Sequence, residues 1–515
     1  MTLQTLQRAA GYAGLAKDLL AARLTGSEQT RDRAHQHLAQ RMGRLHGLPQ
    51  KLGQMLSFSS ATEASGSADH FADLQESAEP LPWPTIRAAL QQAWECDPDS
   101  LIAEVDLQGH AASLGQVHRA QLVDGREVAI KVQYPGIRQA VQTDLQALGV
   151  LSMPFGNLRR GFDFAAYREV IASDLQRELD YEQEAANQRA FGQHWSDNSA
   201  VVVPRVIDEL SSDSVLVSTW ETGEHWDDVR AHWPAADRQR LASALLQMFL
   251  QGIFRHGAMQ ADWHPGNLRF RRSAAGVQIV MYDFGCFCAP TPDERLALAR
   301  LIHATSDASE EPWPLLMKLG FNADYLEPLE AKLPAVCRVL FEPFCHDRPY
   351  DLADWKLSDR LADILGDDRW NFRIAGPANL IFMLRAFHGL IHYLSGLGVS
   401  VNWQSHFAEA TAPLRSQWTS LSLPVDVRGP ANYRSIAQHL KIRVLEAGQI
   451  KVQLTQAAMN IERLHELLDD ELQTRLASAG IDLRAILREV RRRGYAPGPV
   501  FQLREGVKQV DVVLE

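Results

Sequence analysis

The sequence is poor in cysteine, in long apolar runs and in positive charge. Five cysteines in 515 residues are an odd number and too few to staple a chain of this length, so we expect a reducing compartment. Cys286 and Cys288 lack a Cys/His pair that would complete a metal spacing, and we interpret them as buried apolar side chains. Lys and Arg number 52 against 63 Asp and Glu, a net charge of −11. This balance argues against nucleic acid as a partner, because binding phosphates needs clustered cations.

Apolar runs are also too short for a membrane protein of the ordinary kind. No stretch reaches the roughly 18 uncharged apolar residues of a spanning helix, and polar residues interrupt the N-terminal segment, which excludes a signal-peptide core. The nearest candidate, residues 374–399, contains Arg385, so we interpret it as a buried helix of a soluble domain. We expect a cytoplasmic protein. Its weakly amphipathic first helix packs on the protein's own core or, as the alternative, lies on a membrane surface.

Periodicity divides the chain into helical and strand-rich parts. Residues 1–80 are typical of helices, and prolines near position 82 mark a boundary. Strands are expected at 117–122, 127–132, 215–219 and 277–282, and helices at 164–195, 238–256 and through most of 290–421. The tail predicts a hairpin over 442–454, then two helices and a last strand at 510–514. This order indicates an α+β protein with domains 1–84, 85–222, 223–428 and 429–515.

A loop of small residues precedes a lysine on a strand. A strand lysine alone is normally solvated, but here a hairpin through Asp124-Gly125 links the loop to Lys131. Small side chains let backbone N–H groups approach an anion closely. Loop, strand, hairpin and strand lysine follow the order found in the nucleotide-binding lobe of kinases. The small residues of this loop are Ala111, Ala112, Ser113 and Gly115.

Four carboxylates crowd residues 178–184. A solvated helix face is the ordinary explanation of such a run. In one continuous helix Asp180 and Glu184 would share a face, and the neighbouring Tyr181 indicates partial burial. Because buried carboxylates need cationic partners, Lys131 is a candidate partner for one of them.

The strongest pattern joins two carboxylates and an amide. Asp262 and Asn267 have the Asp-x-x-x-x-Asn spacing of a kinase catalytic loop, and Asp283 follows an apolar strand in Asp-Phe-Gly. Oxygen atoms of Asn267 and Asp283 could hold Mg²⁺, and the metal would bridge nucleotide phosphates. His264, between them, is more simply explained as a residue that orders the loop by hydrogen bonding than as a base or ligand.

With these residues in this order, the chain resembles the UbiB/AarF/ADCK family of atypical kinases, the family of coenzyme Q biosynthesis factors, over roughly residues 40–400. Its most specific mark is the Lys-x-Gly-Gln motif, matched by Lys51 and Gln54. The family's Glu-x-Asp motif matches Glu178 and Asp180, and its alanine-rich loop resembles the small-residue loop beginning at Ala111.

The resemblance implies a bilobal protein-kinase-like fold with roles for these residues. Lys131 would contact the phosphates and pair with Glu184, and Asp262 would be the catalytic-loop aspartate. Lys51, in an extension that folds over the peptide site of a protein kinase, would meet Glu178 or Asp180. The hinge that reads adenine would consist of Thr219, Trp220 and Glu221. Three departures from the family pattern bear on the site: His110 before the loop, Gln260, and Trp263, which could narrow the site.

The sequence therefore predicts an enzyme that uses ATP and Mg²⁺. We expect an atypical kinase or ATPase that acts on, or supports processing of, a lipid-like or isoprenoid quinone precursor. A protein kinase would need an open peptide groove and an Ala-Pro-Glu segment, and the sequence after Asp283 has no such segment. A nucleotide-binding scaffold without turnover would lack one of Lys131, Asp262, Asn267 or Asp283, and all four are present.

Overall fold

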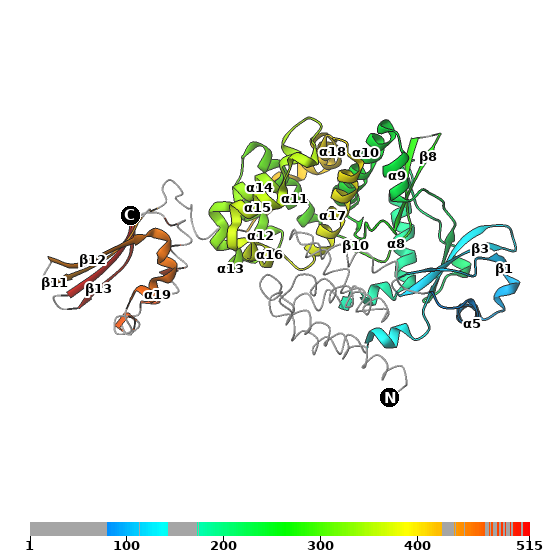
Figure 1. The fold of residues 1–515 in the computed structure, drawn as a ribbon, viewed down its shortest axis with the longest axis horizontal. Coiled ribbons are helices and arrows are strands. Elements are labelled where there is room, and N and C mark those ends of the chain that lie inside the picture. Colours follow the sequence, from blue (N-terminus) through cyan, green and yellow to red (C-terminus); the bar gives the residue numbers. More distant parts are fainter. Residues whose placement is uncertain are drawn as a thin grey trace, which may run out of the picture. The chain divides into compact units, whose positions relative to one another are not determined.

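The structure is a computed structural model that describes residues 80–142 apart from 113, residues 172–424 apart from 174 and 275, and most of residues 437–515 (Figure 1). The expected helices of residues 1–79 lie outside the described residues, as do Lys51, Gln54 and Ser113. The chain forms two compact units. The first holds the described residues up to Ala299, with Pro343–Ser358 and Ala378–Thr419; the second holds Arg300–Glu342, Asp359–Pro377 and Ser420–Glu515.

The first unit begins with a small lobe built on an antiparallel sheet. Its strands lie in the order β1-β3-β4-β6, with β2 paired to β3. The predicted hairpin is present, and Gly125 adopts the left-handed φ of 87° that its turn requires. The strands are β1 Ile102–Val105, β2 His110–Ala111, β3 Gly115–Leu122, β4 Glu127–Gln133 and β6 Val215–Thr219.

Alternation along β4 gives the small lobe two different faces. Val128, Ile130 and Val132 are buried in one cluster with Ile86 of helix α5 (Trp83–Trp94). Because successive strand residues point to opposite faces, Lys131 is directed to the other face, toward helix α8 (Tyr181–His194). The solvated position that a strand lysine normally takes is therefore closed by α8.

Helix α8 begins later than predicted. The expected continuous helix is broken at Asp180, which has φ −109° and ψ 86° and caps α8 by accepting a hydrogen bond from the Gln183 N–H. The prediction that Asp180 and Glu184 share one helix face is therefore wrong. An aspartate side chain competes with the backbone for hydrogen bonds, which favours a cap over a mid-helix position.

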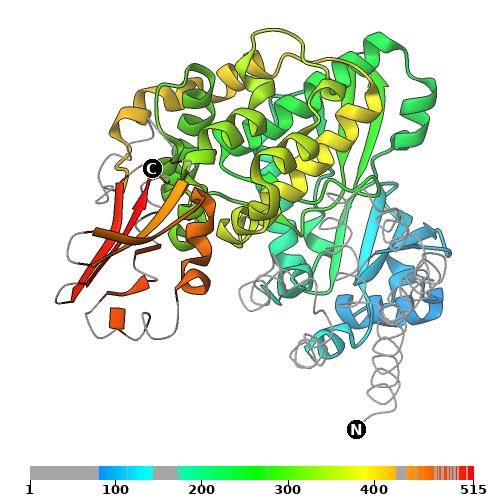
Figure 2. The same ribbon diagram turned by 60° about the vertical axis from the view of Figure 1, so that its left-hand side comes forward.

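The large lobe of the first unit joins helices to short antiparallel strands (Figures 1 and 2). Helix α10 continues as a π-helical turn and ends at Gly257, where φ is 70°, so the predicted end is confirmed. Two hairpin-like pairings, β8 with β9 and β7 with β10, hold the loops that carry Asp262 and Asp283. The elements are α9 Trp226–His232, α10 Ala235–Gln251, β7 Met259–Gln260, β8 Leu268–Ser273, β9 Gly276–Met281, β10 Phe287–Cys288, α17 Leu380–Leu397 and α18 Trp403–Thr411.

Helix α17 is, among the described helices, the one long and apolar enough to cross a membrane, with a mean hydropathy of 1.3. Arg385 in its middle forms an ion pair with Asp262 of the same lobe, and its residues Phe382, Leu390 and Leu394 are buried. These contacts pack one part of α17 on its own lobe, and 39% of the segment is buried, less than the prediction of a buried helix expected.

The second unit combines short helices with a four-stranded tail sheet. The helices include α12 Pro312–Lys318, α13 Ala323–Leu326, α14 Leu333–Leu340 and α16 Arg369–Ala375. The sheet is antiparallel in the order β12-β11-β14-β13. Its strands are β11 His439–Glu446, β12 Gln449–Ala457, β13 Gly498–Glu505 and β14 Lys508–Leu514.

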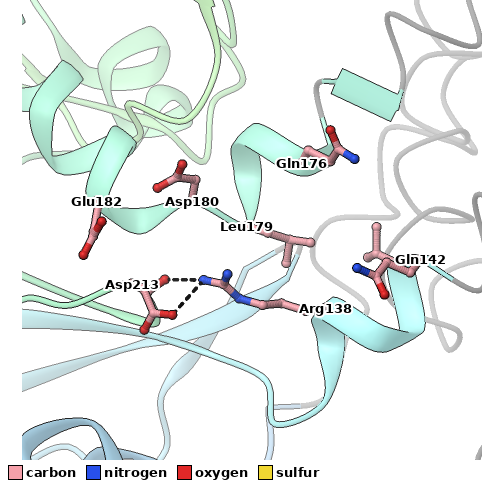
Figure 3. A pocket seen from close by; sticks show the side chains of 8 residues that line it. Arg138, Gln142, Gln176, Leu179, Asp180, Glu182 and Asp213 are labelled. Atoms are coloured by element: carbon pink, nitrogen blue, oxygen red, sulfur yellow. Dashed lines mark hydrogen bonds and ion pairs between the residues drawn. The ribbon is translucent and has the colours of Figure 1, made fainter.

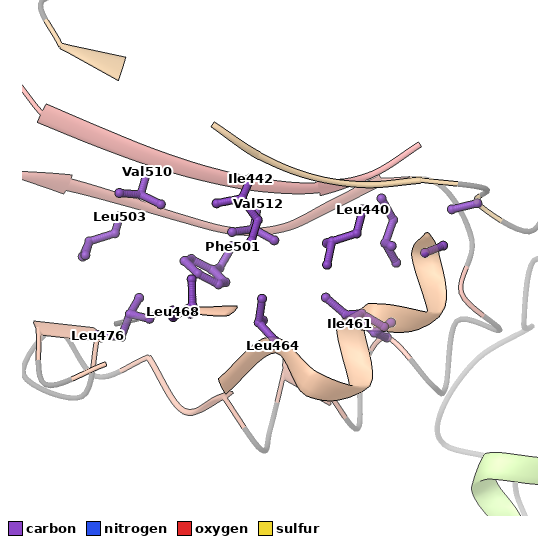
Figure 4. Close-up of a cluster of buried hydrophobic side chains, with 14 residues drawn as sticks. Leu440, Ile442, Ile461, Leu464, Leu468, Leu476, Phe501, Leu503, Val510 and Val512 are labelled. Carbon is purple, nitrogen blue, oxygen red and sulfur yellow. The ribbon is translucent and has the colours of Figure 1, made fainter. Parts of the chain in front are cut away.

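The tail has its own hydrophobic core (Figure 4). Leu440, Phe501 and Val512 of the sheet pack with Ile461 and Leu464 from the helical layer. The predicted hairpin and last strand are present, but the prediction missed β13. Its Gly-Pro start argued against a strand, while Phe501 and Leu503 do alternate as a half-buried strand requires.

Candidate functional site

Lys131 forms the ion pair that was expected with Glu184. Lys131 Nζ lies 2.5 Å from Glu184 Oε1, and the two side chains are 19% and 1% exposed. Burial opposes the charge on Lys131, but Glu184 and Asp283 outweigh it and hold the pKa of the ammonium above its usual value. The Lys131 ammonium also lies 5.0 Å from the centre of the Tyr181 ring. A partly buried cation is thus paired with Glu184 on the inner face of the small lobe, close enough to Asp283 to interact with it electrostatically.

The segment after β9 is docked on α8. Phe284 is fully buried and packs 5.7 Å from the ring of Phe191. Asn187 Nδ2 donates to the Phe284 carbonyl at 3.0 Å, and the Gly285 N–H donates to Asp283 Oδ1 at 2.8 Å. These contacts fix Asp283 close enough to Lys131 and Glu184 to act on the pKa of both.

The loop from Asp262 to Asn267 folds back on itself. Asn267 Nδ2 donates to the Asp262 carbonyl oxygen at 3.2 Å, and the Asn267 N–H donates to the His264 carbonyl at 2.8 Å. The Gly266 N–H donates to His264 Nδ1 at 3.0 Å, so the loop-ordering interpretation of His264 is confirmed. With its Nδ2 engaged, Asn267 keeps its carbonyl Oδ1 as the atom suited to a hard cation.

The side chain of Trp263 is turned into the lobe. It is 3% exposed, its indole N–H donates to the Gln260 carbonyl at 2.8 Å, and its ring meets Phe249 edge to face at 5.9 Å. The expectation that Trp263 could narrow the site is therefore wrong. Gln260 is buried as well, and its Nε2 donates to the Asp262 carbonyl at 3.0 Å. This hydrogen bond helps to hold the loop in place.

Arg385 is the site residue that sequence reasoning missed. Its Nη2 lies 2.7 Å from Asp262 Oδ2, and each side chain is 8% exposed. The available signal was the single arginine inside a long apolar stretch, because a charge in such a position needs a partner. Its partner lies 123 residues earlier in the chain, so no local pattern identifies it.

The small-residue loop lies against β3 and β4. Ala111 is in β2, and the Ala112 N–H donates to the Gly115 carbonyl at 2.8 Å. A side chain at Gly115 would meet the Val132 carbonyl oxygen at 2.2 Å, so only glycine fits there. Behind the loop, Gln116 Nε2 lies 2.8 Å from His118 Nε2 in a fully buried pair.

The expected hinge residues already use part of their backbone. The Trp220 N–H donates to the Glu127 carbonyl at 2.9 Å, and the Glu221 carbonyl accepts from the Tyr282 hydroxyl at 2.8 Å. Thr219 Oγ1 accepts from the Arg205 N–H at 2.9 Å. These bonds fasten the connection between the lobes.

A pocket of about 330 Å³ opens beside the start of α8 (Figure 3). One wall is closed by Arg138, whose Nη2 donates to the Asp213 carbonyl at 2.7 Å. Asp180 and Glu182 line the pocket as well, so that with Asp213 the lining holds three carboxylates. Glu178 lies on the other side of the break, where its Cγ would be 3.8 Å from a Cβ built on Gly285. The pocket is lined by Arg138, Val141, Gln142, Gln176, Leu179, Asp180, Glu182 and Asp213.

The donor set fits magnesium only with the help of phosphates. Within the part of the chain that the structure describes, no three His, Cys, Asp or Glu residues gather as a metal cluster. Cys286 and Cys288 are buried, and burial raises the pKa of the Cys288 thiol to about 12, which agrees with their interpretation as apolar side chains. Mg²⁺ usually takes one or two protein ligands together with substrate phosphates and water, and Asn267 with Asp283 is a set of that kind.

Comparison with known proteins agrees with this geometry. Residues 73–311 match the ABC1 atypical kinase-like domain. The chain is 33% identical to the mitochondrial atypical kinase coq-8 of Caenorhabditis elegans over 66% of this chain and 46% of that protein. It is 25% identical to the mitochondrial atypical kinase COQ8 of Saccharomyces cerevisiae over 73% of this chain and 75% of that protein.

A solved structure matches over a similar length. Rv3197 from Mycobacterium tuberculosis, in complex with erythromycin, is 26% identical, with a TM-score of 0.50, and the match covers 74% of this chain and 96% of that one. The chain spans about half the length of the first curated relatives it matches. The kinase-like α+β fold with two lobes is thereby confirmed, and the chain contains an ABC1 atypical kinase-like domain and is similar to the COQ8 atypical kinases.

Proposed function

We propose that the first unit binds Mg·ATP between the small-lobe sheet and the loop from Asp262 to Asn267, and that the protein is an ATPase or atypical kinase. The observation that carries this proposal is the Lys131–Glu184 ion pair, whose lysine also interacts electrostatically with Asp283. A lysine that Glu184 holds near Asp283 is suited to the phosphates of a nucleotide whose metal Asp283 would hold.

Each part of the nucleotide has a proposed partner. The loop of Ala111, Ala112, Ser113 and Gly115 would lie close to the phosphates because its side chains are small, and Thr219–Glu221 would lie along adenine. Asn267 Oδ1 and Asp283 would hold Mg²⁺, which neutralises charge on the phosphates. Asp262 would face the attacking oxygen.

The names of the relatives support a proposal for the substrate class. Relatives carry names of the COQ8 group, and we propose a lipid-like or isoprenoid quinone precursor as the molecule that is phosphorylated or whose processing is supported. Lys51 and Gln54 would restrict access of proteins to the site. The pocket beside Asp180 supports this role for Lys51, since its lining holds more carboxylates than cations. A cytoplasmic location, with a membrane surface as the alternative, and the four-domain division stay predictions.

The test measures nucleotide binding and turnover by the full chain with and without Mg²⁺. Asp283→Asn should weaken Mg·ATP binding at least about tenfold and leave Mg-free binding unchanged, because an amide is a poorer Mg²⁺ ligand than a carboxylate. Asp228→Asn, which removes an exposed carboxylate of α9, is the matched control and should bind as the parent does. Equal Mg·ATP affinity in Asp283→Asn and the parent would refute the metal assignment.

A further inference from the structure

Helix α17 presents one face to the loop that carries Asp262. Arg385 Nη2 lies 2.7 Å from Asp262 Oδ2 with both side chains 8% exposed. Removing one partner of a buried ion pair leaves an uncompensated charge and is strongly destabilising, whereas the intact pair fixes geometry. The Asp262 carboxylate is therefore held by a group that keeps its charge at every physiological pH.

The same face of α17 holds the next residue of the loop. Gly389 follows Arg385 by four positions and shares its face. A side chain at Gly389 would meet Trp263 Cβ at 2.3 Å and the Trp263 carbonyl oxygen at 3.2 Å. Only a glycine permits this close approach of helix and loop, so two consecutive loop residues, Asp262 and Trp263, rest on one helix.

Asp262 is also hydrogen-bonded to Asn267, the proposed metal ligand. Asn267 Nδ2 donates to the Asp262 carbonyl oxygen at 3.2 Å, and Gln260 Nε2 donates to the same oxygen at 3.0 Å. A displacement of Asp262 would therefore also move the amide of Asn267. The face of α17 that holds the Asp262 side chain and approaches Trp263 therefore supports the backbone to which the amide of Asn267 is bonded.

We propose that Arg385 is a positioning residue that sets the orientation of the Asp262 carboxylate for the reaction. This inference rests on the proposed function and deepens it. With Asp262 Oδ2 held by Arg385, the carboxylate orients the attacking oxygen of water or of an alcohol by accepting its hydrogen bond. Phosphoryl transfer through a loose transition state needs positioning more than proton abstraction.

The experiment compares Arg385→Gln, Arg385→Lys and Arg240→Gln in the full chain. Arg240→Gln removes an arginine from the exposed α10 ion pair with Asp237 and is the matched control. With Mg·ATP as the probe, Arg385→Gln should lower kcat at least about tenfold while KM and nucleotide affinity stay within about twofold, because orientation acts on the transition state. Arg385→Lys, which keeps the charge, should recover part of kcat. An unchanged kcat in folded Arg385→Gln, or a loss confined to KM, would overturn the proposal.

A double-mutant cycle with Asp262→Asn separates this inference from the proposed function. Because Arg385 acts through Asp262, Arg385→Gln should cause no further loss of kcat in the Asp262→Asn background; a multiplied loss would count against it. A parent chain without turnover would refute the proposed catalysis alone. In that case the same cycle is measured by the midpoint of thermal unfolding. A strong coupling between Arg385→Gln and Asp262→Asn supports the role of Arg385 in holding Asp262, and additive effects of the two substitutions overturn it. If Arg385→Gln does not fold, Arg385→Lys enters the same cycles.

Discussion

At the scale of single residues, the Lys131–Glu184 pair is expected both to stabilise the fold and to take part in nucleotide binding. Lys131→Met should lower the free energy of unfolding by about 3–5 kcal/mol, because Glu184 would remain buried without its cation. Adding Glu184→Leu should recover much of this loss without restoring nucleotide affinity. Denaturant unfolding of the two single variants and the double variant measures the first effect, and nucleotide titration measures the second. Recovery of binding in the double variant would contradict a phosphate-binding role for Lys131.

A second residue-scale prediction concerns acid stability. His256 stacks on His194 at 4.9 Å, and burial, His194 and Arg255 lower the pKa of His256 from 6.5 to about 4. Between these two pH values the unfolded chain binds the proton that the folded chain excludes, so the free energy of unfolding falls as pH decreases through this window.

His256→Gln should reduce the pH-dependent change in the free energy of unfolding by on the order of 1 kcal/mol. The expected change is small because His256 is partly exposed and solvent weakens its interactions. Unfolding measured at pH 7 and pH 5 gives the difference. His232→Gln is the control, because it makes the same substitution at a histidine on the exposed end of α9. Equal pH slopes for His256→Gln and the parent would contradict the shifted pKa.

At the scale of elements, the start of α8 tests two roles of Asp180 separately. Asp180→Ala removes the cap on Gln183 and should lower the free energy of unfolding by about 1 kcal/mol. Asp180→Asn keeps a capping oxygen and removes the charge, so it should be nearly as stable as the parent. If Asp180 also meets Lys51, Asp180→Asn should alter nucleotide turnover as Lys51→Ala does. Parent-like turnover in both variants would contradict a Lys51–Asp180 contact that acts on the reaction.

The elements also show which predictions local patterns can support. The β3–β4 hairpin, the end of α10 at Gly257 and the strand before Asp283 were predictable because turn residues and alternation are local signals. The break before α8 was missed because Asp180 fits a helix face as well as a cap, and backbone competition decides between them.

At the scale of the whole molecule, the tail should be separable from nucleotide binding. The cluster from Ala437 to Leu514 packs within the tail itself, so truncation at Gly429 should leave a folded protein with the nucleotide affinity of the parent. Circular dichroism and nucleotide titration of the truncated chain check this. A folded truncated chain that no longer binds nucleotide would assign the tail a part in the site.

The sequence by itself determined the order and identity of the chemical groups. Lys131, Asp262, Asn267 and Asp283 were predictable because kinase-type spacing is short and each group lies in or beside a local turn or strand. From the residues alone, the partner of Lys131 was predictable only as one of the four carboxylates in residues 178–184, and the family resemblance singled out Glu184.

Only the tertiary structure decided how these groups are held. The Arg385–Asp262 ion pair joins residues 123 positions apart, and the contact of Gly389 with Trp263 depends on how closely α17 approaches the loop. Trp263 itself was expected in the site and lies in the core instead. Local periodicity places a residue on a face of its own helix or strand, but which other element meets that face is set by packing of the whole lobe.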